Sequence, residues 1–286
     1  MPDQKFIEIT ECPRDAMQGW PAFIPTQKKI RYLQNLLNAG FQNLDFGSFV
    51  SAKSIPQMAD TKEVVSALNP NAQTKLLAIT ANLRGAAEAV QYDNIDKIGF
   101  PFSVSETFQL RNTNSSIATS FETVREIQEL CLKNNKTLVV YLSMGFGNPY
   151  GDFYSEDMVL NWVENFLELN ISDLSIADTV GLASVEQVNS LLDKVGKAQP
   201  MLQIGVHLHA AKETMIEKLD AALLAGCTRF DSAIKGIGGC PMSGSDLVGN
   251  IDTEIMIDHF HKRGYSTSVD MNILAASSRM ASDIFI

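Results

Sequence analysis

The sequence predicts an α/β fold, a (β/α)8 TIM barrel with additional C-terminal helices. Eight short apolar runs recur along the 286 residues, and their β-branched and aromatic side chains are typical of strands. Amphipathic, helix-like stretches lie between several of these runs, and eight strand–helix units in roughly 240 residues fit a closed barrel. We therefore expect one catalytic domain over residues 1–286, with the barrel at about 5–250 and the extra helices at about 251–286.

The expected strands and helices alternate along the chain. The strand runs are 6–10, 41–49, 75–80, 97–102, 137–143, 173–178, 202–209 and 229–234. The helices are 26–40, 119–135, 184–198 and 212–227, followed after the barrel by 251–264 and 271–285. The first of these helices places Leu33, Leu36 and Leu37 at helical spacing. The third begins with Ser184 and Gln187, the pattern of a capping box.

An open, doubly wound sheet is the alternative arrangement of alternating strands and helices. That fold commonly carries a G-x-G-x-x-G turn after its first strand. Here the first run is followed by ECPRDAMQG, which lacks this pattern, and no linker rich in proline, glycine or serine divides the chain. The sequence therefore favours the closed barrel.

Composition and charge limit the kinds of partner that the protein can have. The formal net charge of −10 disfavours a general nucleic-acid surface or an anionic membrane surface. No long apolar run indicates a membrane span, and the N-terminus lacks the pattern of a signal or transit peptide. Four cysteines without a C-x-x-C pair do not indicate a zinc knuckle or a redox pair. We expect a cytoplasmic protein that binds neither nucleic acid nor membrane.

Polar and ionisable residues gather at the expected carboxyl ends of the strands, where barrel enzymes have their active sites. Arg14 and Asp15 follow the first strand, and Asp178 and Thr179 lie at the end of the sixth. The other polar residues at such ends are Asp45, Ser48, Asn82, Ser143, His207 and His209. Because scattered surface residues would not share one end of a barrel, we expect a functional site there.

The strongest single feature is the H-x-H pattern of His207 and His209 on the seventh strand. Residues two apart in a strand face the same side, so both imidazoles can reach one metal ion. With Asp15 they form a mixed nitrogen and oxygen site, suited by ligand type to Mg, Mn, Zn or Fe(II). The alternative is a pair of hydrogen-bonded, inert histidines. His259 and His261 repeat the pattern in a helical context, where the side chains diverge, and we expect them at the surface.

A glycine-rich loop, GIGGCP at 236–241, follows the eighth strand. Its glycines permit backbone angles closed to other residues, which suits a lid over a ligand. Cys240 in this loop is a candidate acid, base or nucleophile if its pKa is shifted. The alternative is a tight loop with an incidental thiol, and Cys12 allows the same two interpretations. Cys131 and Cys227 lie on helix-like stretches and are expected in or near the core.

Taken in order, several segments resemble those of the hydroxymethylglutaryl-CoA lyase family in the DRE-TIM metallolyase superfamily. They are PRDAMQ (13–18), SFVSAKSIPQMAD (48–60), ANLRG (81–85), SETFQLRN (105–112), ADTVG (177–181), VHLH (206–209), GIGGCP (236–241) and GNIDTE (249–254). The SFV segment and GIGGCP are specific to the lyase branch, whereas R-D and H-x-H mark only the superfamily. The resemblance covers essentially the whole chain. It implies retro-Claisen cleavage of 3-hydroxy-3-methylglutaryl-CoA to acetyl-CoA and acetoacetate, in leucine catabolism and ketone-body formation.

The resemblance also implies binding of a divalent cation, Mg2+ or Mn2+, by Asp15, His207, His209 and Asn250. It implies catalytic roles for Arg14, Asp45, Asp178, His207 and Cys240. Arg14 would stabilise the enolate formed at the thioester. His207 or Asp178 would take the proton of the C3 hydroxyl, and Cys240 would protonate the product. Substrate contacts are expected from Gln18, Ser48, Lys53, Asn82, Arg111 and Thr179.

Some positions depart from the family pattern. Ala210 stands where the family often has Asp after H-x-H, Asp45 stands for a glutamate, and Asn148 stands for a cysteine. The segment TECPRD replaces E-V-G-P-R-D, so Glu11 and Cys12 have no assigned role. A related aldolase or Claisen-condensing enzyme, a lyase for a longer 3-hydroxy-3-alkylglutaryl-CoA, and a non-catalytic metal or acyl-CoA binding barrel remain as alternatives. The protein is expected to be a homodimer that acts on an acyl-CoA.

Overall fold

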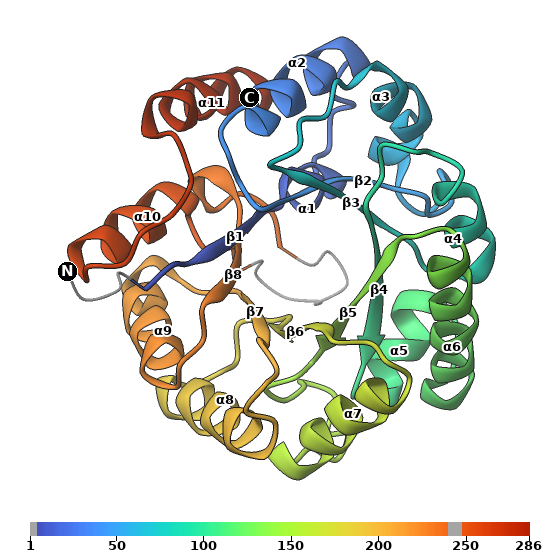
Figure 1. Cartoon of the computed structure of the whole chain (residues 1–286), viewed down its shortest axis with the longest axis vertical. Helices are drawn as coiled ribbons and strands as arrows, with labels where there is room; N and C mark the ends of the chain where they lie inside the picture. Colours follow the sequence, from blue (N-terminus) through green and yellow to red (C-terminus); the bar gives the residue numbers. More distant parts are fainter. Residues whose placement is uncertain (1–4, 240–247) are drawn as a thin grey trace.

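Eight parallel strands close into a barrel in the computed structural model, which describes residues 5–239 and 248–286 (Figure 1). The strands are β1 (Glu8–Glu11), β2 (Asn43–Ser48), β3 (Lys75–Ile79), β4 (Lys97–Ser103), β5 (Thr137–Ser143), β6 (Asp173–Asp178), β7 (Gly205–Leu208) and β8 (Arg229–Ser232). Each strand pairs with the next, and β1 pairs with β8, where Ile9 lies beside Phe230. Because this last pairing closes the sheet, the predicted barrel is confirmed and the doubly wound alternative is wrong.

Most helices surround the barrel on its outside (Figure 1). Within the barrel units they are α1 (Pro13–Gln18), α2 (Thr26–Leu37), α3 (Thr61–Ala67), α4 (Leu83–Ala89), α5 (Glu106–Thr113), α6 (Ile117–Lys133), α7 (Glu156–Glu168), α8 (Val185–Ala198) and α9 (Lys212–Leu224). They are followed by α10 (Thr253–Lys262) and α11 (Met271–Ile284), and two short 3-10 segments, η1 (Pro56–Met58) and η2 (Ile234–Gly236), interrupt the loops. All six expected helices are present. Their ends differ by three residues at most, as where α2 ends at Leu37 and not at Gly40.

Five helices, α1, α3, α4, α5 and α7, were not among those expected. Four of them have only six to eight residues, too few for apolar residues to establish a helical period. The exception is α7, which has 13 residues and begins after Ser155, whose side chain accepts a hydrogen bond from the amide of Met158. Its buried residues Val159, Val163 and Phe166 recur at helical spacing, so the sequence did carry a signal for it.

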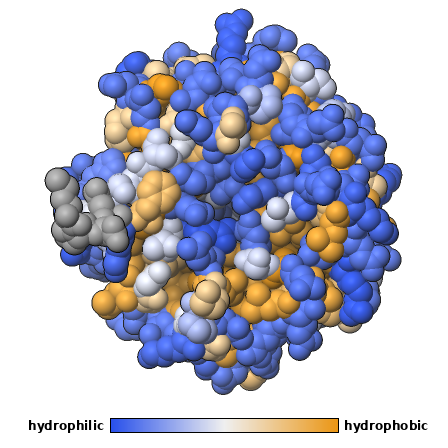
Figure 2. All heavy atoms as spheres, viewed as in Figure 1, coloured by the Kyte–Doolittle hydropathy of each residue, from blue (hydrophilic) through white to orange (hydrophobic). Residues whose placement is uncertain are grey.

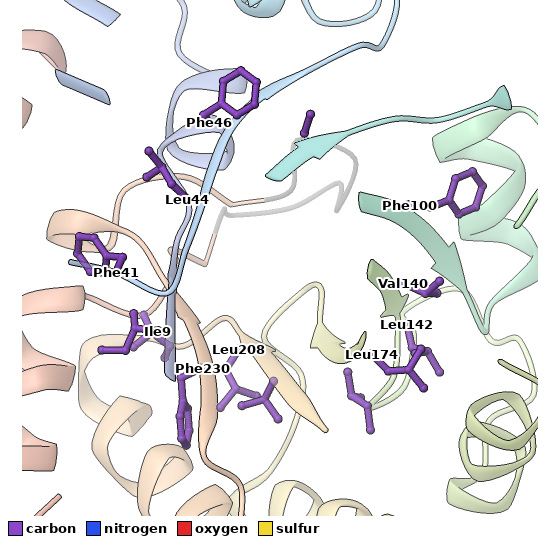
Figure 3. Packing of buried hydrophobic residues seen from close by; sticks show 14 of the residues in the cluster. Ile9, Phe41, Leu44, Phe46, Phe100, Val140, Leu142, Leu174, Leu208 and Phe230 are labelled. Carbon is purple, nitrogen blue, oxygen red and sulfur yellow. The ribbon is translucent and has the colours of Figure 1, made fainter. Parts of the chain in front are cut away.

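The large apolar side chains of the strands form the core together with those of the surrounding helices (Figure 3). Ile9, Leu44 and Phe230, for example, are buried almost completely. Because side chains alternate across a strand, sequence neighbours of core residues, such as Asp45 and His207, turn to the interior of the barrel. The apolar pattern of the strands therefore also fixes which polar residues meet inside the barrel.

Charged residues join three strands at their amino ends. Asp173, the first residue of β6, accepts a hydrogen bond from Lys97 Nζ at 2.7 Å and forms an ion pair with Arg229. Lys97 begins β4 and Arg229 begins β8. Burial would raise the pKa of Asp173, but Arg229 and then Lys97 outweigh it and lower that pKa. These ion pairs lie at the end of the barrel opposite to the carboxyl ends of the strands.

The surface in Figure 2 is mostly hydrophilic, with apolar patches between the polar side chains. Large exposed apolar side chains include Phe153, Met201 and Leu224, which lie on separate segments of the chain. Among the helices of residues 5–239 and 248–286, none combines the length and the hydropathy that crossing a membrane requires.

Candidate metal and substrate site

A cavity of about 580 Å³ lies at the carboxyl ends of the strands. Its polar wall includes Arg14, Asp15, Gln18, Asp45, Asn82, Arg111, Ser143, Thr179, His207 and His209. Apolar residues, among them Val50, Ile55, Ile79 and Phe108, form another part of the wall. Most of the polar residues expected from the strand ends therefore meet around one space.

Three side chains in this wall could hold a metal ion together. Asp15 lies in α1 directly after β1, whereas His207 lies in β7 and His209 just beyond its end. One ligand atom of each lies within 4.8 Å of the others. The two histidine Nε2 atoms are 3.1 Å apart, which confirms that both imidazoles face the same side. A carboxylate and two imidazoles suit several divalent ions by ligand type.

Hydrogen bonds orient both imidazoles from behind. His207 Nδ1 lies 3.1 Å from Asp231 Oδ2 in β8, and His209 Nδ1 lies 2.9 Å from the carbonyl oxygen of Val248. Such contacts turn the Nε2 side of each ring toward the other ring and toward Asp15. Asp231 was not anticipated from the sequence, although its inward position in the expected strand 229–234 was a signal for it.

Nearby charges set the ionisation of this group. Burial would raise the pKa of Asp15, but Arg14 and then the two histidines outweigh it and lower that pKa. Burial lowers the pKa of His209, and His207 lowers it further. The pKa of His207 is raised because its hydrogen bond and charge interaction with Asp231 exceed the opposing effect of burial. An ionised carboxylate and a neutral imidazole are the forms that ligate cations.

Asn250, the fourth expected ligand, lies beside the group. Its amide nitrogen donates to Asp15 Oδ2 at 2.7 Å and to the carbonyl oxygen of Ile237 at 2.9 Å, so nitrogen and not oxygen faces Asp15. Gly238 makes this approach sterically feasible. Its φ is +103°, and a Cβ there would lie 2.7 Å from Asn250 Nδ2 and 3.0 Å from the Asp15 carbonyl oxygen.

Arg14 lies between two carboxylates in the cavity wall. Its Nε and Nη2 donate to Asp45 Oδ2 at 3.0 and 2.6 Å. Its Nη1 donates to Asp15 at 3.2 Å and to Gln18 at 2.8 Å, and Gln18 donates in turn to Asp15 at 2.7 Å. Burial raises the pKa of Asp45 to about 6, against the opposing effect of Arg14. The PRDAMQ segment and Asp45 thus form one hydrogen-bonded wall.

Asn82, Arg111 and Thr179 also line the cavity, where substrate contacts were expected. Asn82 caps α4 as well, because its side-chain oxygen accepts a hydrogen bond from the amide of Gly85 at 2.9 Å. The guanidinium of Arg111 lies 4.6 Å from the centre of the Tyr150 ring, a stacking contact that restrains it.

Two expected substrate contacts, Ser48 and Lys53, are not part of the cavity wall. Ser48 is buried, and its Oγ accepts a hydrogen bond from the amide of Val50 at 3.1 Å, so it shapes the turn after β2. Lys53 is exposed in the loop that follows. Ser51 and Ser54 of the same loop line the cavity instead. The loop that the sequence indicated does reach the cavity, but no periodicity sets the direction of side chains in a loop.

Asp178 lies behind the cavity wall and not in it. Its Oδ2 accepts a hydrogen bond from Lys218 Nζ at 2.8 Å, and its Oδ1 accepts one from the amide of Ala183 at 3.1 Å. This position does not support the expected role as a base, whereas His207 does face the cavity. Lys218 was not anticipated, because a lysine in an amphipathic helix is normally expected at the surface.

Glu11, for which the sequence indicated no role, is completely buried. Its Oε1 accepts a hydrogen bond from the amide of Ile234 at 2.8 Å, and its Oε2 accepts one from the hydroxyl of Thr253 at 2.6 Å. Burial raises its pKa to about 8. Glu11 thereby connects β1 to Ile234, before Gly238, and to Thr253, after Asn250.

Three of the four cysteines lie among the described residues, and all three are buried. Cys240 lies outside the described residues. Cys12 is buried, donates to the carbonyl oxygen of Thr10 at 3.6 Å, and has its pKa raised by burial. Its sulfur, His207 and Asp231 also form a group of ligand atoms that could hold a metal ion. Cys131 and Cys227 are buried, as predicted.

The second H-x-H pattern lies on α10. His261 is exposed, as predicted, with Nε2 3.3 Å from Thr267 Oγ1. His259 is half-buried, and its Nε2 lies 2.7 Å from Asp220 Oδ1 in α9. The surface prediction therefore holds for His261 and only in part for His259, which connects two neighbouring helices.

The chain is similar to several known proteins along nearly its full length. The model of the HMGL-like family matches residues 5–281. Hydroxymethylglutaryl-CoA lyase YngG of Bacillus subtilis is 31% identical over 280 residues, which cover 98% of this chain and 93% of that protein. The 3-hydroxy-3-isohexenylglutaryl-CoA/hydroxymethylglutaryl-CoA lyase of Pseudomonas aeruginosa is 30% identical, over 94% of this chain and 90% of its own.

A solved structure has the same architecture. The HMG-CoA lyase of Acinetobacter baumannii, in complex with coenzyme A and 3-methylmalate, superimposes with a TM-score of 0.91 at 31% identity. The match covers 98% of this chain and 91% of that one. Similarity of sequence and of fold thus extends over the whole barrel.

Proposed function

Because the chain belongs to the HMGL-like family, we propose that it cleaves 3-hydroxy-3-methylglutaryl-CoA to acetyl-CoA and acetoacetate. One observation carries this proposal, the placement of Asp15, His207 and His209 beside Arg14 on the wall of one cavity. Breaking the C2–C3 bond of a 3-hydroxyacyl thioester needs a proton acceptor for the C3 hydroxyl and a positive charge near the thioester oxygen. The cavity offers groups for both tasks.

We propose that Asp15, His207 and His209 hold a divalent cation, Mg2+ or Mn2+. Their donor set fits such an ion, because one carboxylate and two imidazoles whose ligand atoms lie within 4.8 Å of one another suit divalent cations by ligand type. Asn250 would join them with its amide oxygen turned toward the ion. When bound, the cation would act as a Lewis acid for the C3 hydroxyl.

Arg14 is proposed to stabilise the negative charge that develops on the thioester oxygen. Contacts with Asp45, Asp15 and Gln18 fix the guanidinium in advance. A charge that is oriented before the reaction loses no energy to reorganisation while the enolate forms. Asp45, which accepts hydrogen bonds from Arg14, would balance part of its positive charge.

His207 has two proposed roles that one ring nitrogen cannot perform together, because a nitrogen that binds a cation cannot accept a proton. A His207→Gln variant separates them. Loss of Mn2+ binding would assign His207 as a ligand, whereas normal Mn2+ binding with no turnover would assign it to proton transfer from the C3 hydroxyl. Cys240 stays the proposed acid that protonates the acetyl-CoA enolate.

The substrate contacts that we propose are Gln18, Asn82, Arg111 and Thr179, all of which line the cavity. Arg111 supplies a second cation for an anionic group of the acyl-CoA. A local cation matters here, because the net charge of −10 would otherwise repel an anionic substrate. The cytoplasmic location and the homodimer also stay predictions of the sequence.

The direct test is to incubate the purified protein with 3-hydroxy-3-methylglutaryl-CoA, Mg2+ or Mn2+ and a thiol reductant, and to measure acetoacetate. We expect product with metal and none after treatment with EDTA. Absence of acetoacetate with every divalent metal tried would refute the proposal. The Asp15→Asn variant, which keeps the size of the side chain but removes its charge, should fold and show no turnover.

A second candidate substrate is a 3-hydroxy-3-alkylglutaryl-CoA with a longer alkyl group. The apolar part of the wall, with Val50, Ile55, Ile79 and Phe108, favours this candidate. A competition assay with a mixture of the methyl and a longer-chain substrate gives the ratio of their kcat/KM values. A ratio above one for the longer chain would favour it, and preference for the methyl substrate would exclude it as the main substrate.

A further inference from the structure

Lys218 is a buried cation on the side of α9 that packs against the barrel. Its side chain is about as inaccessible as its apolar neighbours, with 3% of the residue exposed. Its Nζ donates to Asp178 Oδ2 at 2.8 Å, to the His209 carbonyl oxygen at 3.0 Å and to the Gly181 carbonyl oxygen at 3.3 Å. Since an ammonium has three N–H donors, these contacts use all of them.

The three acceptors belong to the ends of two neighbouring strands. Asp178 ends β6, Gly181 lies in the loop after it, and His209 follows β7. Asp178 also precedes Thr179, which lines the cavity. Without Lys218, one carboxylate and two carbonyl oxygens would converge in the interior with no donor between them, which is unfavourable. The ammonium therefore holds these two strand ends together.

We propose that Lys218 is a positioning residue for the cation site. By binding Asp178 and the main chain of His209, it holds the end of β7 where the His209 ring meets Asp15 and His207. This inference rests on the proposed function, which gives the cation its role in the reaction. The property that it predicts is the affinity of the site for the cation. At this strand end, where Ala210 follows the H-x-H pattern, Lys218 of α9 supplies a polar contact to the main chain.

A second buried pair in the same chain provides a matched control. Lys29 in α2 is 2% exposed, and its Nζ donates to Asp60 Oδ1 at 2.7 Å and to the carbonyl oxygen of Gln57. It resembles the Lys218 pair in chemistry and in the burial of the lysine, yet its hydrogen bonds lead to no proposed metal ligand. If each lysine–aspartate pair only stabilised the fold, removing the Lys29 pair and removing the Lys218 pair should have the same effect on Mn2+ binding.

The experiment compares Mn2+ binding by the full-length wild type with that of three variants. Lys218→Met/Asp178→Asn removes both charges of the pair, because removing one partner alone leaves an uncompensated buried charge that destabilises the fold. Asp178→Asn alone retains Lys218 and an amide oxygen that can accept a hydrogen bond from its Nζ, so we expect Lys218 to keep its bond to the His209 carbonyl oxygen. Lys29→Met/Asp60→Asn is the control. Electron paramagnetic resonance of free Mn2+ gives the dissociation constant, and circular dichroism gives Tm and establishes folding.

We expect the dissociation constant for Mn2+ to rise about 10-fold or more in Lys218→Met/Asp178→Asn. It should stay near the wild-type value in the control and in Asp178→Asn, although every variant loses thermal stability. Wild-type affinity in the Lys218 double variant would overturn the inference. Equal weakening in Asp178→Asn or in the control would overturn the assignment to Lys218.

Two measurements on the wild type, Mn2+ binding and acetoacetate release, separate this inference from the proposed function. If it binds Mn2+ but releases no acetoacetate from 3-hydroxy-3-methylglutaryl-CoA, the proposed function fails while the inference about the cation site stands on the variants. If it does not bind Mn2+, the inference fails, whereas the proposed function is still judged by acetoacetate release with the other divalent metals.

Discussion

The guanidinium of Arg14 donates hydrogen bonds to two carboxylates at once, and this geometry leads to a prediction about turnover. A lysine in its place would keep the positive charge but lose the planar fork that donates to Asp45 and Asp15 together. We expect Arg14→Lys to lower kcat about 100-fold, since a displaced charge stabilises the enolate poorly, and to leave Mn2+ binding intact. Acetoacetate formation measures the first effect and Mn2+ titration the second.

The control for this change is Arg125→Lys on α6, where the half-exposed guanidinium forms an ion pair with Glu122 one helical turn away. It should keep wild-type turnover. A kcat for Arg14→Lys within about 2-fold of the wild type would contradict a role that depends on the guanidinium.

Glu11 leads to a prediction about pH. Its folded-state pKa of about 8 lies above the ordinary value of 4.5, so its contribution to stability is fully present below pH 4.5 and is lost as the pH rises toward 8. Glu11→Gln removes this titration. The free energy of unfolding of the variant relative to the wild type should therefore rise between pH 5 and 8, by at most roughly 1.4 kcal/mol per pH unit.

Urea denaturation of the wild type and of Glu11→Gln at several pH values measures this difference. The difference at pH 5 serves as the reference, because little of the titration has taken place there. A difference that stays constant from pH 5 to pH 8 would show that Glu11 does not titrate in this range.

At the residue scale, the sequence predicted the parts of the site that follow from strand period and strand ends. The ligand atoms of Asp15, His207 and His209 meet as expected. Alternation within β7 turns both histidines to one side, and the β1–β8 pairing that closes the barrel brings the end of β1 near them. The supporting contacts were not predictable in this way. Asp231 reaches His207 from β8, and Lys218 reaches Asp178 across 40 residues of sequence. Such contacts depend on distances between elements, which no local pattern specifies.

At the scale of elements, the capping box of α8 was predicted from the sequence and is confirmed. Ser184 Oγ accepts a hydrogen bond from the amide of Gln187 at 3.2 Å, and the Gln187 side chain accepts one from the amide of Ser184 at 2.9 Å. We expect Ser184→Ala to lower the free energy of unfolding by about 1 kcal/mol, because an amide in the first turn loses its acceptor. Turnover per folded molecule should not change.

Chemical denaturation and the acetoacetate assay together check this expectation. Ser66→Ala on α3 is the matched control, since the Ser66 hydroxyl is exposed and donates back to the Lys62 carbonyl oxygen at 2.8 Å within the same helix. This hydrogen bond does not cap the start of a helix, so its loss should change the free energy of unfolding only slightly. An equal loss of stability in both variants would argue against a capping effect.

Long helices and strands were predictable because each repeats its period several times. The short helix α1 was not, although it carries Arg14, Asp15 and Gln18. Six residues hold fewer than two helical turns, so no apolar stripe can appear. Pro13 at its start and the contacts of Arg14 with Asp45 define it instead, and those contacts come from another strand. The helix that contributes three residues to the cavity wall was thus not visible as a helix in the sequence.

At the scale of the whole molecule, the two ends of the barrel carry different groups of polar residues. The carboxyl ends of the strands surround the cavity, whereas Asp173, Lys97 and Arg229 join the amino ends. The number and order of the strands could be predicted from eight apolar runs of similar spacing. The ion pairs at the amino ends could not, because they require the relative register of β4, β6 and β8.

This division predicts that a change at Asp173 alters stability without altering catalysis. The pKa of Asp173 is lowered in the folded protein, so its contribution to stability is present above the ordinary pKa near 4 and is lost as the pH falls below it. Asp173→Asn should therefore lower the free energy of unfolding by roughly 2–4 kcal/mol at pH 7, where it leaves Lys97 and Arg229 without their partner. The deficit should shrink below about pH 4, while kcat per folded molecule at pH 7 stays at the wild-type value.

Asp193→Asn is the matched control for that measurement. Asp193 pairs with Lys197 on the exposed side of α8 at 2.6 Å, and such a pair contributes at most about 0.5 kcal/mol. Urea denaturation of the wild type and both variants at about pH 7 and about pH 2.5, well below the ordinary pKa of the carboxyl, separates the two cases. A deficit for Asp173→Asn as small as that of the control, or one that persists unchanged at the lower pH, would show that the ion pairs at the amino ends do not stabilise the closed barrel. The same deficit with reduced kcat would instead show that the two ends of the barrel are coupled.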